Sequence, residues 1–181
     1  INLPVFPLVR NRELLMRWME LNAFSVIFRT HEGISPDVNH QFYTDTQTIV
    51  HFSRCARIYT AWACYRKQLV QEAAATGMPV VRHPFLHYPQ NQRLRAVKFE
   101  QFLIGDAFMV APVLDPGKDR IGCYLPMGQW IHVWSKQEYN VDKDGLEVVV
   151  DAPLGKPAVF CKSGIPVTTE FINNLEASGL R

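Results

Sequence analysis

The hydrophobic positions before residue 77 predict two helices. The first is expected to begin at Asn11, whose side chain can cap it, and to run to about Leu21. The second is expected to open at the capping-box pattern Thr44-x-x-Gln47 and to carry one apolar face as far as residue 75. Gly77 can adopt the left-handed conformation that ends a helix, so the long helix should stop there.

A short apolar segment, Phe24–Arg29, lies between these two helices. Its sequence, F-S-V-I-F-R, is partly β-branched and is followed by a polar loop over residues 30–43. Such a segment is typical of a strand buried in a parallel sheet. A strand between helices, with a long loop after it, indicates an α/β barrel or a doubly wound sheet.

The pattern changes to short strands beyond residue 79. Apolar segments alternate there with turn clusters rich in Pro, Gly and Asp, which is typical of an antiparallel sandwich. The strand candidates are Val80–His87, Ala107–Val113, Cys123–Leu125, Trp130–Trp134, Leu146–Val150 and Ala158–Cys161. One or two helical turns are expected over 93–101 and a closing helix over 171–177. The predicted domains are therefore 1–79 and 80–181.

The composition of the 181-residue chain supports a folded core and indicates no highly charged partner. Hydrophobic residues make up 48% of the chain, which excludes intrinsic disorder. The charges are dispersed and sum to +2, so neither nucleic acid nor a membrane is an expected partner. No apolar stretch approaches the roughly 18 residues that a membrane helix needs. The chain starts with Ile rather than Met, which suggests a processed or truncated product.

No cofactor and no metal site is predicted. His83 and His87 are four residues apart, but Pro84 disrupts a helical pair, so structural imidazoles are expected. The cysteines form no C-x-x-C pair and are expected to be half-buried free thiols: Cys55, Cys64, Cys123 and Cys161. They leave the cellular compartment open, with the cytoplasm slightly favoured. The tryptophans fall on amphipathic patterns and are expected in the core: Trp18, Trp62, Trp130 and Trp134.

The most informative candidate site is a polar cluster after the predicted strand. Arg29, His31 and Glu32 follow Phe28 directly, and sites in α/β barrels form at the carboxyl ends of strands. A guanidinium, an imidazole and a carboxylate together can bind a hydroxyl-rich or anionic ligand. The structural alternative stays open. In it, Arg29 and Glu32 form an internal ion pair and His31 only caps the loop.

Several motifs, in order along the whole chain, resemble the last part of family 31 glycoside hydrolases. They are R-N-R-E-L-L-M-R-W (10–18), A-F-S-V-I-F-R-T-H-E-G (23–33), G-M-P-V-V-R-H-P-F-L-H-Y (77–88), Q-F-L-I-G-D-A-F-M-V-A-P-V (101–113) and Y-L-P-M-G-Q-W (124–130). The segment A-P-L-G-K-P-A-V-F (152–160), together with F-R-T-H-E-G, is similar to the sulfoquinovosidase branch.

The resemblance implies an α/β plus all-β fold, the C-terminal end of a (β/α)₈ barrel followed by an antiparallel β-sandwich. Phe24–Arg29 would be the eighth barrel strand, between the seventh and eighth barrel helices. The family's chemistry is retaining hydrolysis of α-glycosides. It uses a nucleophile and a general acid/base, two carboxylates about 5–5.5 Å apart.

The chain departs from the family in lacking both catalytic carboxylates. The family carries them after the fourth and sixth strands, in segments like W-x-D-x-x-E and G-D-N or G-D-Q, and neither occurs here. Ile1 falls just downstream of where the D-I-G-G segment of the seventh strand would end. Gly105-Asp106 belongs to a strand pair of the β domain. We therefore assign no catalytic residue and expect the isolated chain to be inactive, since a whole barrel needs about 250 residues.

The resemblance carries substrate contacts over to this chain. His31 matches the family's histidine that hydrogen-bonds hydroxyls of the cleaved sugar, and Arg29 matches an arginine that braces the site. Glu32 is a further substrate-binding candidate, with Gln41 and Tyr43 on the pocket rim. The expected partners are an α-linked sugar and the remainder of the barrel, in an upstream segment or companion chain. The alternative function is a non-catalytic sugar-binding or assembly module.

Overall fold

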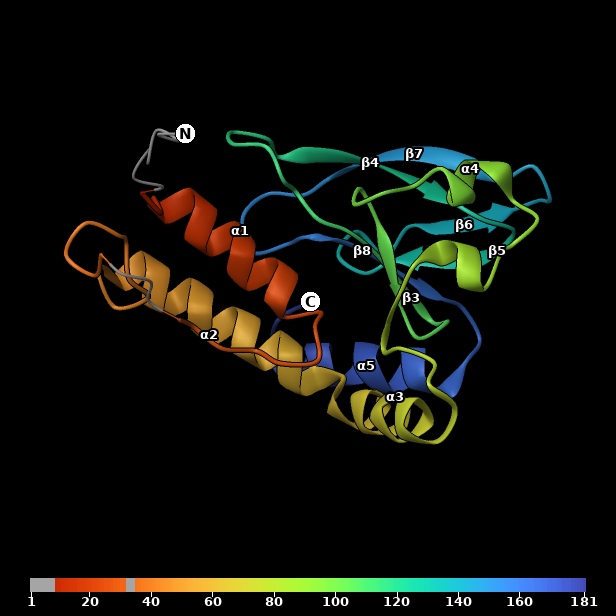
Figure 1. Cartoon of the computed structure of the whole chain (residues 1–181), viewed down its shortest axis with the longest axis horizontal. Coiled ribbons are helices and arrows are strands. Elements are labelled where there is room, and N and C mark those ends of the chain that lie inside the picture. The colour runs from red at the N-terminus through yellow and green to blue at the C-terminus, as the bar shows by residue number, and fades with distance from the viewer. Residues whose placement is uncertain (1–8, 32–34) are drawn as a thin grey trace, which may run out of the picture.

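The computed structural model describes residues 9–31 and 35–181. The fold contains both helices and antiparallel sheets (Figure 1). Two helices, α1 (Arg12–Asn22) and α2 (Thr46–Ala61), pack side by side. Three further helices, α3 (Ala63–Thr76), α4 (Gln92–Arg95) and α5 (Pro166–Ala177), complete the helical part.

Local sequence signals set the ends of the first helices. The Asn11 side chain caps α1 by accepting a hydrogen bond from the Leu14 amide, as predicted. The start of α2 differs from the prediction, because the Asp45 side chain, and not that of Thr44, caps the helix by accepting from the Thr48 amide at 2.7 Å. A carboxylate is favoured there because it interacts well with the positive end of the helix dipole.

The predicted long helix is divided at Trp62. Its backbone leaves the helical conformation at φ −110° and ψ 23°, so that α2 ends there and α3 begins. The break turns the indole inward, where it is 1% exposed and donates from Nε1 to the Ala23 carbonyl. Gly77 ends α3 at φ 79°, in the left-handed conformation that the sequence predicts.

The predicted strand Phe24–Arg29 is wrong for this structure. The segment is a turn followed by irregular chain, and none of the strands among the described residues pairs with it. A buried strand needs a neighbouring backbone to satisfy its amide and carbonyl groups. Side chains replace that neighbour in part, because the Tyr59 hydroxyl donates to the Val26 carbonyl and Ser25 Oγ donates to the Ile27 carbonyl.

The strands form two antiparallel sheets. The larger has the order β1-β2-β3-β8-β5-β6, and the smaller pairs β4 with β7. Their bounds are β1 (Val81–Arg82), β2 (Phe102–Ile104), β3 (Phe108–Ala111), β4 (Arg120–Leu125), β5 (Gly128–His132), β6 (Glu138–Val141), β7 (Leu146–Asp151) and β8 (Ala158–Lys162). The longest register runs through β4 and β7, from Arg120 opposite Asp151 to Leu125 opposite Leu146.

Most strand candidates are confirmed, with three differences. Strand β2 was not among the candidate ranges and enters the sequence analysis only through the strand pair around Gly105-Asp106. The candidate Val80–His87 shrinks to the two residues of β1, because Pro84 has no amide hydrogen and opens the 3₁₀ turn η1 (Pro84–Leu86). Strand β6 has no sequence prediction, since its E-Y-N-V sequence carries only a weak apolar alternation. The helical turn α4 falls within 93–101 apart from its first residue, and α5 begins five residues before the expected position 171.

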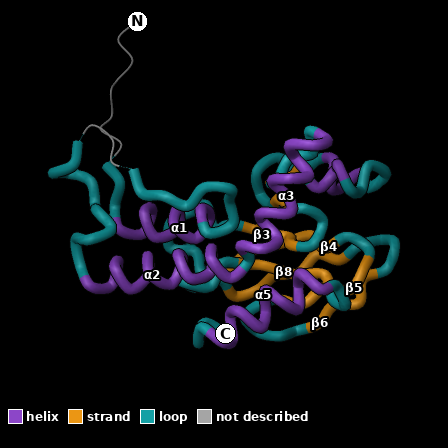
Figure 2. The backbone as a smooth tube through the Cα atoms, turned by 90° about the horizontal axis from the view of Figure 1, so that it is seen from below, coloured by secondary structure: helices purple, strands orange, loops and turns teal. Residues whose placement is uncertain are grey.

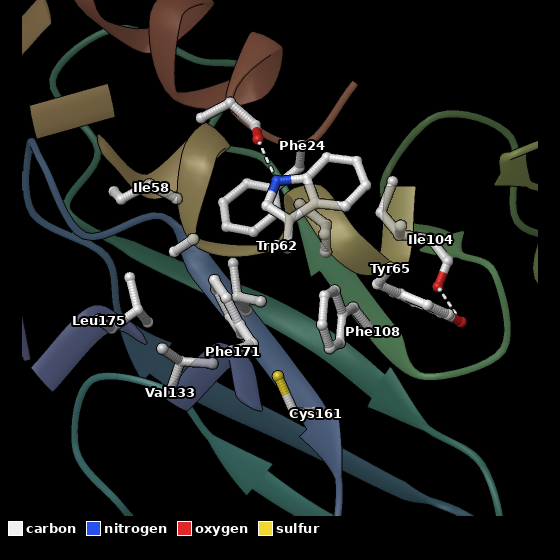
Figure 3. Packing of buried hydrophobic residues seen from close by; sticks show 14 of the residues in the cluster. Phe24, Ile58, Trp62, Tyr65, Ile104, Phe108, Val133, Cys161, Phe171 and Leu175 are labelled. Carbon is white, nitrogen blue, oxygen red and sulfur yellow. Dashed lines mark hydrogen bonds between the residues drawn. The ribbon is translucent and has the colours of Figure 1, made fainter. Parts of the chain in front are cut away.

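The larger sheet separates two apolar clusters. One cluster packs side chains of α1, α2, α3 and α5 against one sheet face, through residues such as Phe108 and Cys161 (Figures 2 and 3). The other lies between the two sheets and includes Trp130, Cys123 and Val148. Neighbouring residues along β2, β3 and β8 alternate between the clusters, as strand geometry requires. The helical cluster joins residues from both sides of position 80, and the domain division at 79/80 stays a prediction.

A buried ion pair connects α1 to the loop between β7 and β8. Glu20, 2% exposed, accepts hydrogen bonds from the Gly155 amide at 2.5 Å and from Arg17 Nη1 at 2.9 Å. Arg17 also donates to the Ala152 and Lys118 carbonyls, at 2.9 and 2.6 Å. These bonds fix α1 on the β part of the chain.

Candidate functional site

A hollow of about 560 Å³ lies between α1 and the segment that follows it. Its lining residues are Arg10, Leu14, Leu15, Trp18, Met19, Asn22, Ile27, Arg29, Thr30 and His31. Helix α1 supplies the apolar wall, and residues 27–31 supply the polar side. The hollow therefore combines an aromatic and aliphatic surface with a few polar groups, as ligand sites commonly do.

The structure brings Arg29 and His31 to this same hollow. Both residues are exposed, and within the described residues neither side chain enters a hydrogen bond or an ion pair. Glu32 lies outside the described residues, and so does the alternative Arg29–Glu32 ion pair. One guanidinium and one imidazole are thus left facing the space next to α1, with donors and an acceptor available to a ligand.

Aromatic stacking places the backbone just before Arg29. Phe28 stacks between Phe52 and Tyr59 of α2, with ring centroids 5.4 and 5.5 Å away. Arg66 in turn lies over the Tyr59 ring at 3.5 Å. Segment 26–29 is therefore held on α2 by side-chain packing in the absence of a neighbouring strand.

Gln41 and Tyr43 do not line the hollow. Gln41 is buried inside its own loop, where its side chain accepts from Arg10 and donates to the Pro36 and Asn39 carbonyls. Tyr43 is 62% exposed and packs its edge against Phe42. The expectation that they form the pocket rim is therefore not met by this structure.

Trp18 is a site residue that the sequence analysis placed wrongly in the core. It is 57% exposed and lines the hollow together with Leu14, which is 49% exposed, and Ile27, which is 66% exposed. Helix α1 is apolar on two faces, and the apolar side chains that it buries are those of Leu15, Met16 and Met19, at 3%, 3% and 2% exposure. The apolar stripe of α1 is wider than one buried face needs, and this width was the sequence signal that could have indicated an exposed apolar face.

A second hollow, of about 420 Å³, lies on the other side of the Leu14 and Trp18 side chains of α1. Leu14 and Trp18 line both hollows, and the second is closed by the chain over 112–116. The remaining tryptophans agree better with the prediction, since Trp62 and Trp130 are buried and Trp134 is half-buried. Leu14, Trp18, Val26 and Ile27 are exposed on α1 and the segment after it, while other exposed apolar side chains, such as Phe99 and Val149, lie on the β part of the chain.

The other candidate groups have structural roles. His83 Nε2 lies 2.7 Å from the Val97 carbonyl, and His87 Nε2 lies 3.0 Å from Arg82 Nη1, as the structural interpretation predicts. Among the described residues, no cluster of three or more His, Cys, Asp or Glu side chains could hold a metal ion. Asp106 packs beside Tyr65 and Lys162, on the β part of the chain.

The cysteines are free, and three of the four are more deeply buried than predicted. Burial raises the pKa of the thiols of Cys55, Cys123 and Cys161, which makes them unreactive. Cys64, on α3, is exposed. In the described part of the chain, no helix has the length and apolar character needed to cross a membrane.

Comparison with known proteins gives one consistent family. The profile described as "Glycosyl hydrolase family 31 C-terminal domain" matches residues 77–165. Sulfoquinovosidase of Escherichia coli is 40% identical over 159 residues, covering 88% of this chain and 23% of that protein. Sulfoquinovosidase of Agrobacterium fabrum is 42% identical over 160 residues, covering 88% of this chain and 24% of that protein.

More distant relatives and a solved structure agree. Alpha-glucosidase 2 of Bacillus thermoamyloliquefaciens is 29% identical over 154 residues, which cover 85% of this chain and 19% of that protein. The structure of a GH31 family sulfoquinovosidase from E. rectale, in complex with the aza-sugar inhibitor IFGSQ, superposes with a TM-score of 0.89 at 35% identity. That alignment covers 96% of this chain and 25% of the other.

The chain spans about a quarter of the length of the sulfoquinovosidases it matches. Its identity to the two curated sulfoquinovosidases, 40% and 42%, exceeds its identity of 29% to the α-glucosidase. Residues 77–165 match the C-terminal domain of glycoside hydrolase family 31, and the chain as a whole resembles the C-terminal part of the family's sulfoquinovosidases.

Proposed function

We propose that this chain is the C-terminal segment of a retaining α-glycoside hydrolase of the sulfoquinovosidase type, and that it contributes sugar-binding residues to that enzyme. The observation that supports this most is the convergence of Arg29 and His31 on one hollow beside α1. Glu32, the next residue along, remains a proposed substrate-binding residue of the same site.

The chemistry of these groups suits a sugar ring. A neutral imidazole donates one hydrogen bond and accepts another, so His31 can bind two neighbouring hydroxyl groups. Such bonds contribute to catalysis where they become stronger in the oxocarbenium-like transition state. Arg29 presents a fixed fork of donors that can brace the same hydroxyls or the chain around them.

The proposed enzyme needs groups that this sequence does not contain. Its two catalytic carboxylates, nucleophile and general acid/base, would lie upstream, together with the groups that select the sugar's substituents. In this proposal residues 1–79 complete a (β/α)₈ barrel and residues 80–181 form its C-terminal β-sandwich domain.

The exposed apolar side chains around α1 support an upstream partner. Leu14, Trp18 and Ile27 form part of the wall of the hollow, and each is about half exposed or more. Contiguous exposed apolar surface on a folded protein marks a place where another surface packs. The rest of the barrel, as an upstream segment or a companion chain, is the proposed occupant.

A chimera tests the proposal. This chain would replace the matching C-terminal part of the Escherichia coli sulfoquinovosidase, to which it is 40% identical. We expect the folded chimera to hydrolyse an aryl α-sulfoquinovoside, and the isolated chain to give no turnover, because the covalent intermediate needs both carboxylates.

Two controls complete this experiment. The upstream part of the Escherichia coli protein alone should be inactive, and circular dichroism should show that the chimera is folded. A folded chimera without activity would overturn the enzyme proposal and favour the alternative, a non-catalytic sugar-binding or assembly module. Turnover by the isolated chain at the rate of an intact enzyme would also contradict it.

A further inference from the structure

We propose that Arg10 is a positioning residue for His31, holding the backbone of the sugar-binding segment from the start of α1. The importance of Arg10 for sugar binding rests on the proposed function, whereas its contacts with the loop are independent of that function. Arg10 precedes α1 by two residues, and His31 lies 21 residues further along the chain. Arg10 and His31 both line the hollow described above.

Among the described residues of the loop that contains His31, the guanidinium of Arg10 reaches three acceptors. Nη1 donates to the His31 carbonyl at 2.9 Å, Nε donates to the His40 carbonyl at 3.0 Å, and Nη2 donates to Gln41 Oε1 at 3.2 Å. One side chain thus joins the beginning of the loop to its end. Hydrogen bonds from a charged donor are roughly twice as strong as neutral ones.

The backbone of Arg10 is tied to the same loop. Its amide donates to Asn39 Oδ1 at 2.7 Å, and its carbonyl accepts from the His40 amide at 2.8 Å. Asn11, the next residue, caps α1. The loop is therefore attached to a capped helix N-terminus, which is a rigid support.

The segment that carries the proposed sugar contacts is held at both ends. Phe28 is stacked between two aromatic rings of α2, which fixes the chain just before Arg29. Arg10 holds the carbonyl of His31, which fixes the chain just after Thr30. Only two residues, Arg29 and Thr30, lie between these two anchors, so the backbone that directs the Arg29 and His31 side chains has little freedom.

The fork of an arginine is needed for this role. The three acceptors belong to separate positions on the loop, and a planar guanidinium with five donors can satisfy them together. A lysine keeps the charge but presents it as a point, so Arg10→Lys should hold only part of the loop. Small displacements of a preorganised group reduce a rate strongly, since about 1 Å of misplacement can cost on the order of 100-fold.

The first test measures local order in the 181-residue chain by NMR. Arg10→Met, Arg10→Lys and the control Arg95→Met, which removes an exposed arginine of α4, are compared with the unchanged chain. We expect Arg10→Met to speed amide exchange at His40 at least about tenfold and to increase the motion of the His31 ring on the NMR time scale. Arg10→Lys should give exchange and ring motion between those of the unchanged chain and Arg10→Met. Arg95→Met should change neither the exchange at His40 nor the motion of the His31 ring.

Two results would overturn the proposal. One is identical loop exchange and identical His31 ring signals in Arg10→Met and Arg95→Met. The other is exchange that rises equally in α1, α2 and the sheets, which would make Arg10 a general stabilising residue. Arg10→Lys behaving like the unchanged chain would refute the requirement for a fork.

The second test uses the chimera and separates the two proposals. Arg10→Met should lower kcat/KM about tenfold or more through a lower kcat, whereas Arg95→Met should leave both constants unchanged. An active chimera that is insensitive to Arg10→Met overturns the positioning role and leaves the proposed function standing. An inactive chimera overturns the proposed function, and the NMR result still decides whether Arg10 orders the loop.

Discussion

Replacing Glu20 with alanine should be among the most destabilising single changes in this protein. The carboxylate is 2% exposed, and its oxygens accept from the Gly155 amide and from Arg17. Burial raises the pKa of Glu20, against the opposing effects of the Gly155 amide and the Arg17 charge. Glu20→Ala removes the acceptor but leaves the Arg17 guanidinium buried and charged.

The expected loss follows from what remains after the substitution. Removing one partner of a buried ion pair costs about 3–5 kcal/mol, chiefly because the other charge stays desolvated. Arg17 keeps its bonds to the Ala152 and Lys118 carbonyls, which places the expected loss toward the lower end, at about 3 kcal/mol. Since small domains are stable by only about 5–15 kcal/mol, such a loss is large.

Urea denaturation followed by circular dichroism measures this loss. The matched control is Glu147→Ala, which removes an exposed carboxylate that pairs with the exposed Arg93 on the surface. We expect the control to lose at most about 1 kcal/mol, as exposed ion pairs do.

The double substitution Arg17→Met with Glu20→Met sharpens the test. It replaces both charges with apolar side chains of similar length, so it should recover much of the stability lost in Glu20→Ala. A loss below about 1 kcal/mol for Glu20→Ala would refute the reasoning, because it would mean that the pair is not desolvated in solution.

Two further predictions concern buried groups. Burial lowers the pKa of His132 to about 4, so as pH falls below the ordinary value near 6.5 the unfolded chain takes up the proton first. The free energy of unfolding should therefore decline by about 2–3 kcal/mol between pH 6.5 and 4. In urea titrations at a series of pH values, His132→Phe should make this decline smaller. An equal dependence of the unfolding free energy on pH in both proteins would contradict the lowered pKa of His132. Trp62→Ala should cost about 3–5 kcal/mol and Trp18→Ala less than about 1 kcal/mol in the isolated chain, since the first is 1% and the second 57% exposed. Similar denaturation midpoints for both tryptophan variants would contradict the burial seen here.

Local sequence signals predicted the parts of the fold that depend on local chemistry. Asn11 caps α1 and Gly77 ends α3 because each residue type has a conformational preference that acts over a few neighbours. The strands beyond residue 100 were mostly found, because alternation along strands such as β3 and β8 places every second side chain in the same cluster.

The errors in the fold arise where distant parts of the chain decide the outcome. The helix break at Trp62 depends on the hydrogen bond to the Ala23 carbonyl and on the core around the indole, and no local sequence pattern indicates these contacts. Segment 24–29 reads as a strand, but strand pairing needs a neighbour that the described residues do not supply. Trp18 has the same amphipathic pattern as a core residue, and only the packing of α1 shows which of its two apolar faces is buried.

The candidate site was predictable only in part. Arg29 and His31 could be singled out because a polar cluster follows an apolar segment and matches a family motif. Arg10 could not be singled out, because its hydrogen bonds reach backbone carbonyls 21 and 30 residues away. Every residue has a backbone carbonyl, so the sequence does not indicate which one will accept a hydrogen bond.

The most direct test of the central claim is kcat/KM of the chimera with His31→Ala, compared with His87→Ala. His31 lines the hollow, so its loss should cost about 2–4 kcal/mol, or roughly 30- to 1,000-fold in kcat/KM, with little change in Tm. His87 bonds to Arg82 within the fold, so its loss should lower Tm and leave kcat/KM within a few fold. If His31→Ala unfolds the protein and spares activity while His87→Ala abolishes it, the site lies elsewhere.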